Sequence, residues 1–425
     1  MPEALAPILD IATFIRETLL SLFETLGASP ELANGLVTFI GAFLIANFVL
    51  LILVVNIWME RKVMARLQDR IGPNRVGPWG LFQTVADLGK LLSKEIIIPS
   101  QADLIPFLLA PLLAVMSVIG IWAVIPFAET AIGTDVSIGV LYFMAVSSFG
   151  IMAILMAGWS SNNKYALLGA FRAVAMLVSY EVPIILTLMV PVLLTGSMRM
   201  NEIVMAQNIW FIFMVPLAGI IFYISQVAEV GRQPFDLLEA ESEIVAGYHI
   251  EYSGFAFAIF YAAEWAHGFA ICALFVTLFL GGWQGPFVDQ IPTLGFIYFL
   301  GKTFLVYIIQ IWMRATVPRL RIDQIMDFCW KLLIPVSLAL VVLIALTEGI
   351  ITTLAEQGIL TAPFLANYFS TATAADMLPR TFVLLTINAF ITIVTLFLLA
   401  RRGRAERERF EAMRQSMAPI EAGTD

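Results

Sequence analysis

Long runs of hydrophobic residues separated by short polar stretches dominate the pattern along this chain. A transmembrane α-helix needs about 20 consecutive apolar residues. The predicted spans are residues 35–58, 104–127, 136–158, 173–195, 209–228, 254–281, 294–313, 328–347 and 380–400. Because lipid cannot satisfy backbone polar groups, each run is best formed as a helix. The pattern therefore predicts an all-α integral membrane protein with about nine transmembrane helices.

The N-terminal segment has a different pattern, with apolar residues on one helical face and polar residues on the other. The apolar positions are Leu5, Ile8, Leu9, Ala12, Ile15, Leu19, Leu22, Phe23 and Leu26. This spacing is typical of an amphipathic helix that lies at a membrane interface or docks on a partner. We expect residues 1–30 to form such a helix.

The composition agrees with a membrane protein. The 425 residues are 60% hydrophobic and 13% charged, with a mean hydropathy of +0.90, whereas a soluble domain carries about 25% charged residues. The two cysteines, Cys272 and Cys329, lie in or beside apolar runs and lack the spacing of a zinc or iron–sulfur site. The chain is therefore expected to bind neither metal centre by itself.

The distribution of lysine and arginine predicts the orientation of the chain. With the N-terminus outside, the inner segments contain 20 of the 24 basic residues, and the outer segments contain only Arg16, Arg199 and Arg380. Positively charged segments stay on the cytoplasmic side. We expect a multi-pass protein of the inner (plasma) membrane, with an outer N-terminus and a charged C-terminal tail in the cytoplasm.

Three ionisable residues, Glu181, Glu264 and Lys302, fall near the middle of predicted spans. Charged groups at this depth are costly, so they usually face a cavity or each other and often relay protons. A proton relay is the favoured interpretation, and pairing that only holds the bundle together is the alternative. For His267, one turn from Glu264, a structural role in the bundle is favoured over an essential relay role.

Two loops carry most of the remaining charge of interest. The loop of residues 229–253 opposes one base, Arg232, with the acids Glu229, Asp236, Glu239, Glu241, Glu243 and Glu251. Apolar residues alternate with these acids, which indicates a partly buried proton gate rather than a solvated surface. In the first loop, arginines recur from Arg61 to Arg75, and their pattern fits membrane anchoring and a cofactor role equally well.

Several uncommon strings occur in these loops in a fixed order. They are ERKV (60–63), RIGPNRVGPWGL (70–81), WSSNNKY (159–165), PFD (234–236), EAESE (239–243), GYHIEYS (247–253) and WMRAT (312–316). Together they resemble the family formed by the H subunit of NADH-quinone oxidoreductase, the first membrane subunit of respiratory complex I. The resemblance covers about residues 35–347.

This resemblance implies a membrane subunit of a proton-translocating NADH:quinone oxidoreductase, without a complete active site of its own. It implies a quinone tunnel lined by Arg61, Arg70, Asp87, Arg172 and Phe260 or Tyr261. The implied proton-coupling residues are Glu181, Glu264, Lys302, Glu229, Arg232, Asp236, Glu239, Glu241, Glu243 and Glu251. Quinone would be the substrate, while flavin and iron–sulfur clusters would belong to other subunits.

The resemblance also implies partner subunits and domain boundaries. The expected partners are peripheral iron–sulfur and quinone-reducing subunits, small membrane-arm subunits and membrane lipids, with no nucleic acid. Ser148 stands where some members of the family carry a glutamate. The family usually ends after eight helices, so we expect a tunnel domain at 31–350 and an additional helix with a charged tail at 351–425.

Two other functions remain to be weighed against this one. The first is the homologous membrane subunit of an energy-converting hydrogenase or ferredoxin-linked complex, and the strings at residues 70–81 and 239–253 favour the quinone enzyme over it. The second is a secondary transporter, which predicts internal repeats. The sequence has no such repeat.

Overall fold

The structure is a computed structural model that describes residues 10–237, 245–356 and 378–417. In these ranges the chain forms helices and no strand. Among the described residues, eight helical segments are long and apolar enough to cross a membrane: Pro30–Leu67, Leu104–Ile121, Gly139–Ser160, Lys164–Thr195, Gly254–Phe279, Thr293–Thr316, Ile322–Ile351 and Pro379–Arg401. The predicted all-α membrane fold is therefore confirmed.

The fifth predicted span differs from the others because it is broken. Residues 209–228 were expected to form one helix, but α9 (Phe211–Met214) and α10 (Pro216–Glu229) are separate, with Val215 in a non-helical conformation between them. Proline is favoured in the first turn of a helix, where its missing N–H has no partner to lose. With 14 residues, α10 is shorter than a complete span.

The N-terminal helices begin at well-defined caps. Asp10 caps α2 (Ile11–Thr25) by accepting hydrogen bonds from the backbone and hydroxyl of Thr13, and Ser29 caps α3 (Pro30–Leu67). No residue of α2 is buried, as expected of a helix that lies outside the bundle. Residues 1–9 of the predicted amphipathic helix lie outside the described residues.

The core of the bundle surrounds α12 (Gly254–Phe279), which packs against α3, α5 (Leu104–Ile121), α10 and α13 (Thr293–Thr316). Beside them, α6 (Gly139–Ser160) and α7 (Lys164–Thr195) approach each other closely. A Cβ atom on Gly158 would lie 2.2 Å from the Cβ of Ala170. Small residues allow such close helix packing in membranes, where dispersion forces replace the hydrophobic effect.

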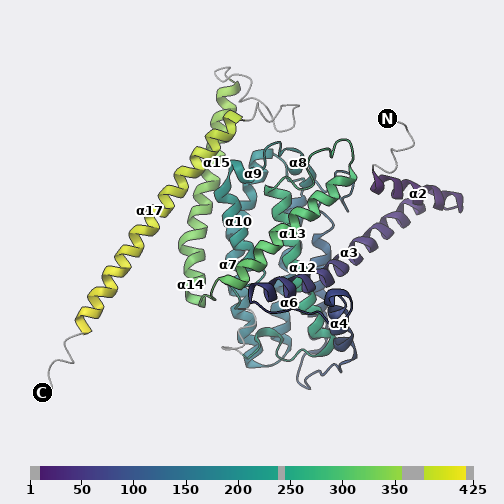
Figure 1. The fold of residues 1–425 in the computed structure, drawn as a ribbon, viewed down its shortest axis with the longest axis horizontal. Helices are drawn as coiled ribbons and strands as arrows, with labels where there is room; N and C mark the ends of the chain where they lie inside the picture. The colour runs from purple at the N-terminus through teal and green to yellow at the C-terminus, as the bar shows by residue number, and fades with distance from the viewer. Residues whose placement is uncertain (1–9, 238–244, 357–377, 418–425) are drawn as a thin grey trace.

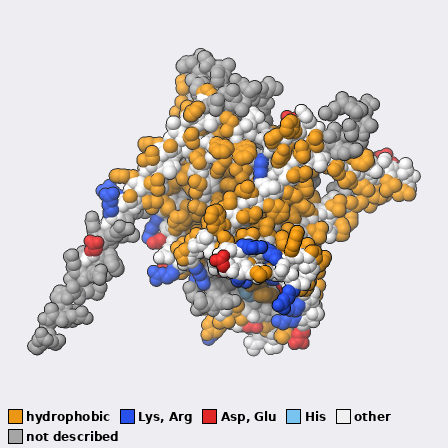
Figure 2. Space-filling view, in the orientation of Figure 1, with side chains coloured by type: hydrophobic (Ala, Val, Ile, Leu, Met, Phe, Trp, Pro, Cys, Tyr) orange, Lys and Arg blue, Asp and Glu red, His pale blue; other side chains and the backbone are white. Residues whose placement is uncertain are grey.

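Most described loops that matter for function lie at one end of the bundle, which we call the loop end and define by residues 68–103, 230–237 and 245–253. It contains η2 (Pro78–Gly80), α4 (Gln83–Ser93) and η3 (Gly247–His249). At 38 residues, α3 is about 57 Å long and carries Glu60 and Arg61 to this end. Figure 2 shows hydrophobic side chains over most of the visible face and charged side chains gathered toward the loop end.

The last quarter of the chain completes the bundle. It contains α14 (Ile322–Phe328), a π-helical turn, η4 (Cys329–Leu333), α15 (Ile334–Glu356) and α17 (Leu378–Met417). The short helix α8 (Met200–Met205) lies at the end opposite the loops. In Figure 1, α17 runs beside α15 and extends past the bundle toward the side of the loop end.

Candidate functional site

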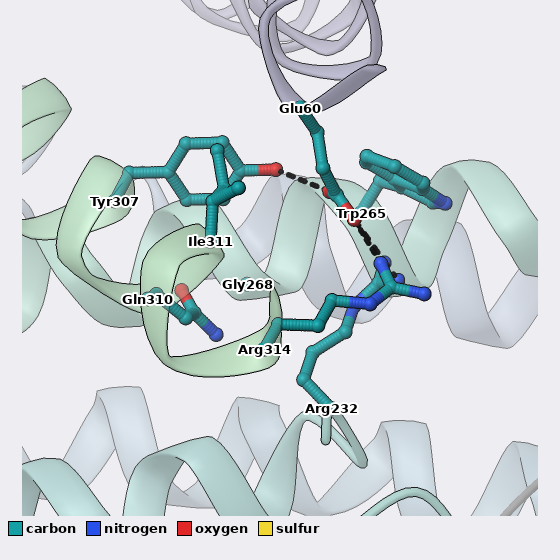
Figure 3. A pocket seen from close by; sticks show the side chains of 8 residues that line it. All are labelled: Glu60, Arg232, Trp265, Gly268, Tyr307, Gln310, Ile311 and Arg314. Atoms are coloured by element: carbon teal, nitrogen blue, oxygen red, sulfur yellow. Dashed lines mark hydrogen bonds and ion pairs between the residues drawn. The ribbon is translucent and has the colours of Figure 1, made fainter. Parts of the chain in front are cut away.

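A buried carboxylate, Glu60, is the centre of a charged cluster at the loop end of α3. Glu60 is 3% exposed. Its Oε2 accepts a hydrogen bond from the hydroxyl of Tyr307 at 3.2 Å, and its Oε1 pairs with the guanidinium of Arg314. In Figure 3 both partners, from α13, point toward Glu60. A buried carboxylate needs such partners, because desolvation of an unpaired charge is very costly.

Arg232 joins this cluster to a second carboxylate. Its Nη2 lies 3.3 Å from Oε1 of Glu264, and its Nη1 lies 4.0 Å from Oε1 of Glu60. Its guanidinium carbon is 4.4 Å from the ring centroid of Trp265, a distance typical of cation–π contact. The two arginines and two glutamates balance in charge. Arg232 is therefore held between a carboxylate on α3 and one on α12.

A small cavity adjoins the cluster. It has a volume of about 10 Å³ and is lined by Glu60, Arg232, Trp265, Tyr307 and Arg314, among others. A space of this size holds about one water molecule.

A larger cavity lies on the other side of Glu264. Its volume is about 80 Å³, and it is bounded by α5, α6, α7, α10 and α12. Glu229, Glu264 and His267 face it. Glu229 accepts a hydrogen bond from the hydroxyl of Ser147 at 2.9 Å, and its Oε1 lies 3.7 Å from Nε2 of His267. The space is large enough for several water molecules, and the two carboxylates and His267 face it from a lining that is otherwise mostly apolar.

Glu181 extends this series of acids toward the surface of the bundle. Its Oε1 accepts a hydrogen bond from the hydroxyl of Ser148 at 3.2 Å, and its carboxylate interacts electrostatically with Glu229. Glu181 lies half-buried at the seam of α6 and α7. The hydroxyl of Ser148 thus contacts the neighbouring acid at the position where some family members have a glutamate. The order of the groups is Glu60, Arg232, Glu264, Glu229 and Glu181.

Arg61 and Asp87, both expected to line a quinone tunnel, form an ion pair between α3 and α4. The distance between Nη1 of Arg61 and Oδ2 of Asp87 is 2.5 Å, and Gln83 donates to the other oxygen at 3.1 Å. Burial acts to raise the pKa of Asp87, but the hydrogen bonds and the charges of Arg61 and Lys90 outweigh it and lower the pKa. The carboxylate is therefore ionised at neutral pH.

The two expected aromatic residues point in different directions. Phe260 is buried, faces the larger cavity and packs against Tyr248 and Tyr252, with ring centroids 5.3 and 5.0 Å apart. Tyr261 packs instead against Phe257 and His249. Burial lowers the pKa of His249 to about 4. This histidine is neutral at physiological pH.

The other expected residues at the loop end do not share one site. Arg70 donates to Gln68 at 2.8 Å on an exposed turn, and Arg172 lies half-buried near the start of α7. Glu251 accepts a hydrogen bond from Asn163 at 2.6 Å and borders a polar surface depression of about 500 Å³. Asp236 is half-buried near the end of the described loop. Glu239, Glu241 and Glu243 lie outside the described residues.

Lys302 requires a correction. We expected it at the depth of Glu264, but its ammonium donates to the carbonyls of Leu280, Gly282 and Gln284 at 2.7–3.1 Å. Since α12 rises about 1.5 Å per residue, the carbonyl of Leu280 at its end lies roughly 24 Å along the helix axis from Glu264. The long side chain reaches the C-terminal end of α12, where carbonyls attract a cation. A role for Lys302 in proton transfer stays a prediction.

Comparisons with known proteins agree with the motifs. The profile of the NADH dehydrogenase family matches residues 40–345. The chain belongs to this family. It is 52% identical over 299 residues to the NADH-quinone oxidoreductase H subunit of Dehalococcoides mccartyi (strain CBDB1), covering 70% of this chain and 83% of the relative. It is 47% identical over 329 residues to the protein of the same name from Geobacillus sp. (strain WCH70), covering 76% and 98%.

Within the NADH dehydrogenase family fold, three residues of the charged cluster were missed as site residues from the sequence: Glu60, Tyr307 and Arg314. The predicted first span ended at residue 58, so Glu60 was assigned to a loop. Helix α3 instead continues to Leu67 and buries Glu60 against α13. The detectable signal was an acid directly after an apolar run, facing a tyrosine and an arginine spaced seven residues apart on another helix.

Proposed function

We propose that this chain is a membrane subunit of a proton-translocating NADH:quinone oxidoreductase, forms much of its quinone tunnel and couples quinone reduction to intramembrane proton transfer. The observation that carries the proposal is the position of Arg232 between Glu60 and Glu264. The arrangement links the loop end to a cavity with carboxylates in the membrane interior. The names of the relatives favour this function over the hydrogenase alternative.

The tunnel is proposed to run along the loop end. Arg61, Arg70, Asp87 and Arg172 would meet the polar head of the quinone on its path, and Phe260 or Tyr261 would contact its apolar parts. Such a site is mostly apolar, with a few polar groups that orient the ligand. The ion pair of Arg61 and Asp87 supports this proposal, because it supplies fixed charges between α3 and α4.

Coupling is proposed to proceed through the shared arginine. Quinone reduction consumes protons and changes the charge near the loop end. When Arg232 moves toward Glu60, Glu264 loses its counter-charge and gains affinity for a proton, because an opposite charge favours the ionised carboxylate. The proton can then pass through the larger cavity to Glu229 and Glu181. The acids Asp236, Glu239, Glu241, Glu243 and Glu251 would regulate proton entry.

The orientation and partners belong to the same proposal. The N-terminus is placed outside and the loop end in the cytoplasm, in the inner membrane, where peripheral iron–sulfur and quinone-reducing subunits would dock. Glu181 is only half-buried at the seam of α6 and α7. Because a carboxylate at this depth is not stable against lipid, a neighbouring membrane-arm subunit would cover it.

Substitution of Arg61 tests the tunnel. Arg61→Ala removes the partner of Asp87, and we expect quinone reductase activity of the assembled complex to fall at least tenfold, with altered sensitivity to quinone-site inhibitors. Glu241→Gln should reduce the same activity. Arg66→Ala is the matched control, since Arg66 is an exposed arginine on the same helix. Normal turnover and normal inhibitor sensitivity in both Arg61→Ala and Glu241→Gln would exclude the tunnel assignment.

A further inference from the structure

About a quarter of this chain lies outside its match to relatives that are themselves covered almost completely. The NADH-quinone oxidoreductase relatives from Geobacillus sp. (strain WCH70) and Geobacillus thermodenitrificans are covered to 98–99% by only 76–77% of this chain. The family match ends at residue 345, before the end of α15. Helix α17 therefore lies outside the part of the chain that the quinone function explains.

Helix α17 buries one narrow stripe of its transmembrane part. Thr381, Leu384, Asn388 and Ile391 are at most 9% exposed, and their spacing of three and four residues is that of a helix seam. The opposite face of α17 is not covered by other described helices of this structure. Its exposed residues include Phe382, Phe390, Ile393, Leu396 and Phe397. A fully buried asparagine in the stripe shows that this face points into protein, because an amide is unfavourable against lipid.

The stripe packs against α9, α10 and α15. This flank contains the broken segment, in which Val215 separates α9 from α10 and α10 has only 14 residues. Non-helical backbone at membrane depth is tolerated only where protein or water surrounds it, since lipid cannot satisfy its polar groups. A helix lying along this flank shields the break from lipid.

We propose that the flank formed by α9, α10 and α15 is a docking surface for a transmembrane helix, and that this chain supplies the helix itself as α17. An ion pair fixes the helix along its axis. Arg380 Nε donates to Oε1 of Glu348 at 3.1 Å, and its Nη2 pairs with Oε2. Both side chains are 11% exposed. The two-point contact of a guanidinium with a carboxylate fixes orientation as well as distance.

The position of α17 leaves the proposed proton path open. Helix α17 packs on α9, α10 and α15, whereas Glu181 lies at the seam of α6 and α7. The additional helix and a neighbouring membrane-arm subunit would therefore occupy different flanks. This separates the docking role of α17 from the quinone function, so the two can be tested independently.

The ion pair provides the test, because removal of one partner leaves a buried charge while removal of both does not. In the complete complex in mild detergent, Arg380→Met and Glu348→Met should each shorten the half-life of the complex at elevated temperature at least tenfold. The double variant should recover to within about threefold of the unaltered complex. If a single variant does not assemble, the amount of assembled complex gives the same comparison.

Phe382→Leu is the matched control, since Phe382 is exposed and lies two residues after Arg380 on the same helix. The half-life of the complex that carries this variant should not change. Quinone reductase activity per assembled complex should be normal in all these variants, which distinguishes failure of docking from failure of the quinone function. Single variants as long-lived as the unaltered complex, or a double variant as short-lived as the single ones, would overturn the proposal.

Discussion

At the scale of single residues, buried charges of this protein occur with defined partners. Glu60 has Arg314 and Tyr307, Glu264 has Arg232, and Lys302 has three backbone carbonyls. Glu229 and Glu181 are different, because they accept hydrogen bonds from the hydroxyls of Ser147 and Ser148, and Glu229 also lies 3.7 Å from His267. A hydroxyl or an imidazole can pass a proton to a neighbouring carboxylate, whereas a guanidinium in a protein does not give up its proton. These two acids are therefore the best candidates for proton carriers.

His249 gives a pH dependence of stability at the same scale. Its pKa is about 4 in the folded protein against an ordinary value of 6.5. The unfolded chain thus binds more protons, so stability from His249 is complete above pH 6.5 and is lost as the pH falls toward 4. The loss is on the order of 3 kcal/mol. We expect the melting temperature of the complex to fall less steeply between about pH 7 and 5 in His249→Phe, which keeps an aromatic ring beside Tyr248 and Phe257. If the melting temperature fell equally with pH in the unaltered protein and in His249→Phe, the buried neutral state of His249 would be contradicted.

At the scale of helices, the hydrophobic pattern predicted the existence of the spans better than their ends. The apolar run of α3 correctly marked a span, but the helix continues nine residues beyond the predicted end at residue 58, to Leu67. The pattern cannot detect this extension, because Glu60 and Arg61 are polar and depend on contacts with α13 and α4. The break before Pro216 has a local cause, and Pro216 was the available signal.

Close packing of η3 on α7 can be tested at Gly169. A Cβ atom on Gly169 would lie 2.7 Å from the carbonyl carbon of Gly247, so Gly169→Ala must displace the loop from α7. Overpacking of this kind costs about 1–3 kcal/mol. We expect a lower melting temperature, faster proteolysis in the loop and lower quinone reductase activity. Gly301→Ala is the control, because no atom lies within 4 Å of its added Cβ. If Gly169→Ala and Gly301→Ala had the same melting temperature, proteolysis rate and activity, the close contact of η3 with α7 would not be needed for stability or activity.

At the scale of the whole molecule, the sequence predicted the family and the membrane fold, and both are confirmed. Glu181 and Glu264 were found from the sequence because an acid inside an apolar run is conspicuous. Glu60, Tyr307 and Arg314 were not found, since their meeting depends on how α3 crosses α13. Lys302 was placed at the wrong depth because the reach of its side chain to the end of α12 depends on the turn that follows. The proposed domain limits at residues 30 and 350 stay predictions.

The central claim is that the carboxylates within this chain carry protons from the loop end into the membrane. The most direct test is the number of protons pumped per electron by the complete complex in proteoliposomes, with Glu181→Gln in place of the native residue. We predict a clear fall in this ratio while quinone reduction continues, because a glutamine cannot take up a proton at the α6–α7 seam. Glu202→Gln, at the opposite end of the bundle from the loops, is the control and should pump normally. An unchanged ratio in Glu181→Gln would contradict the account.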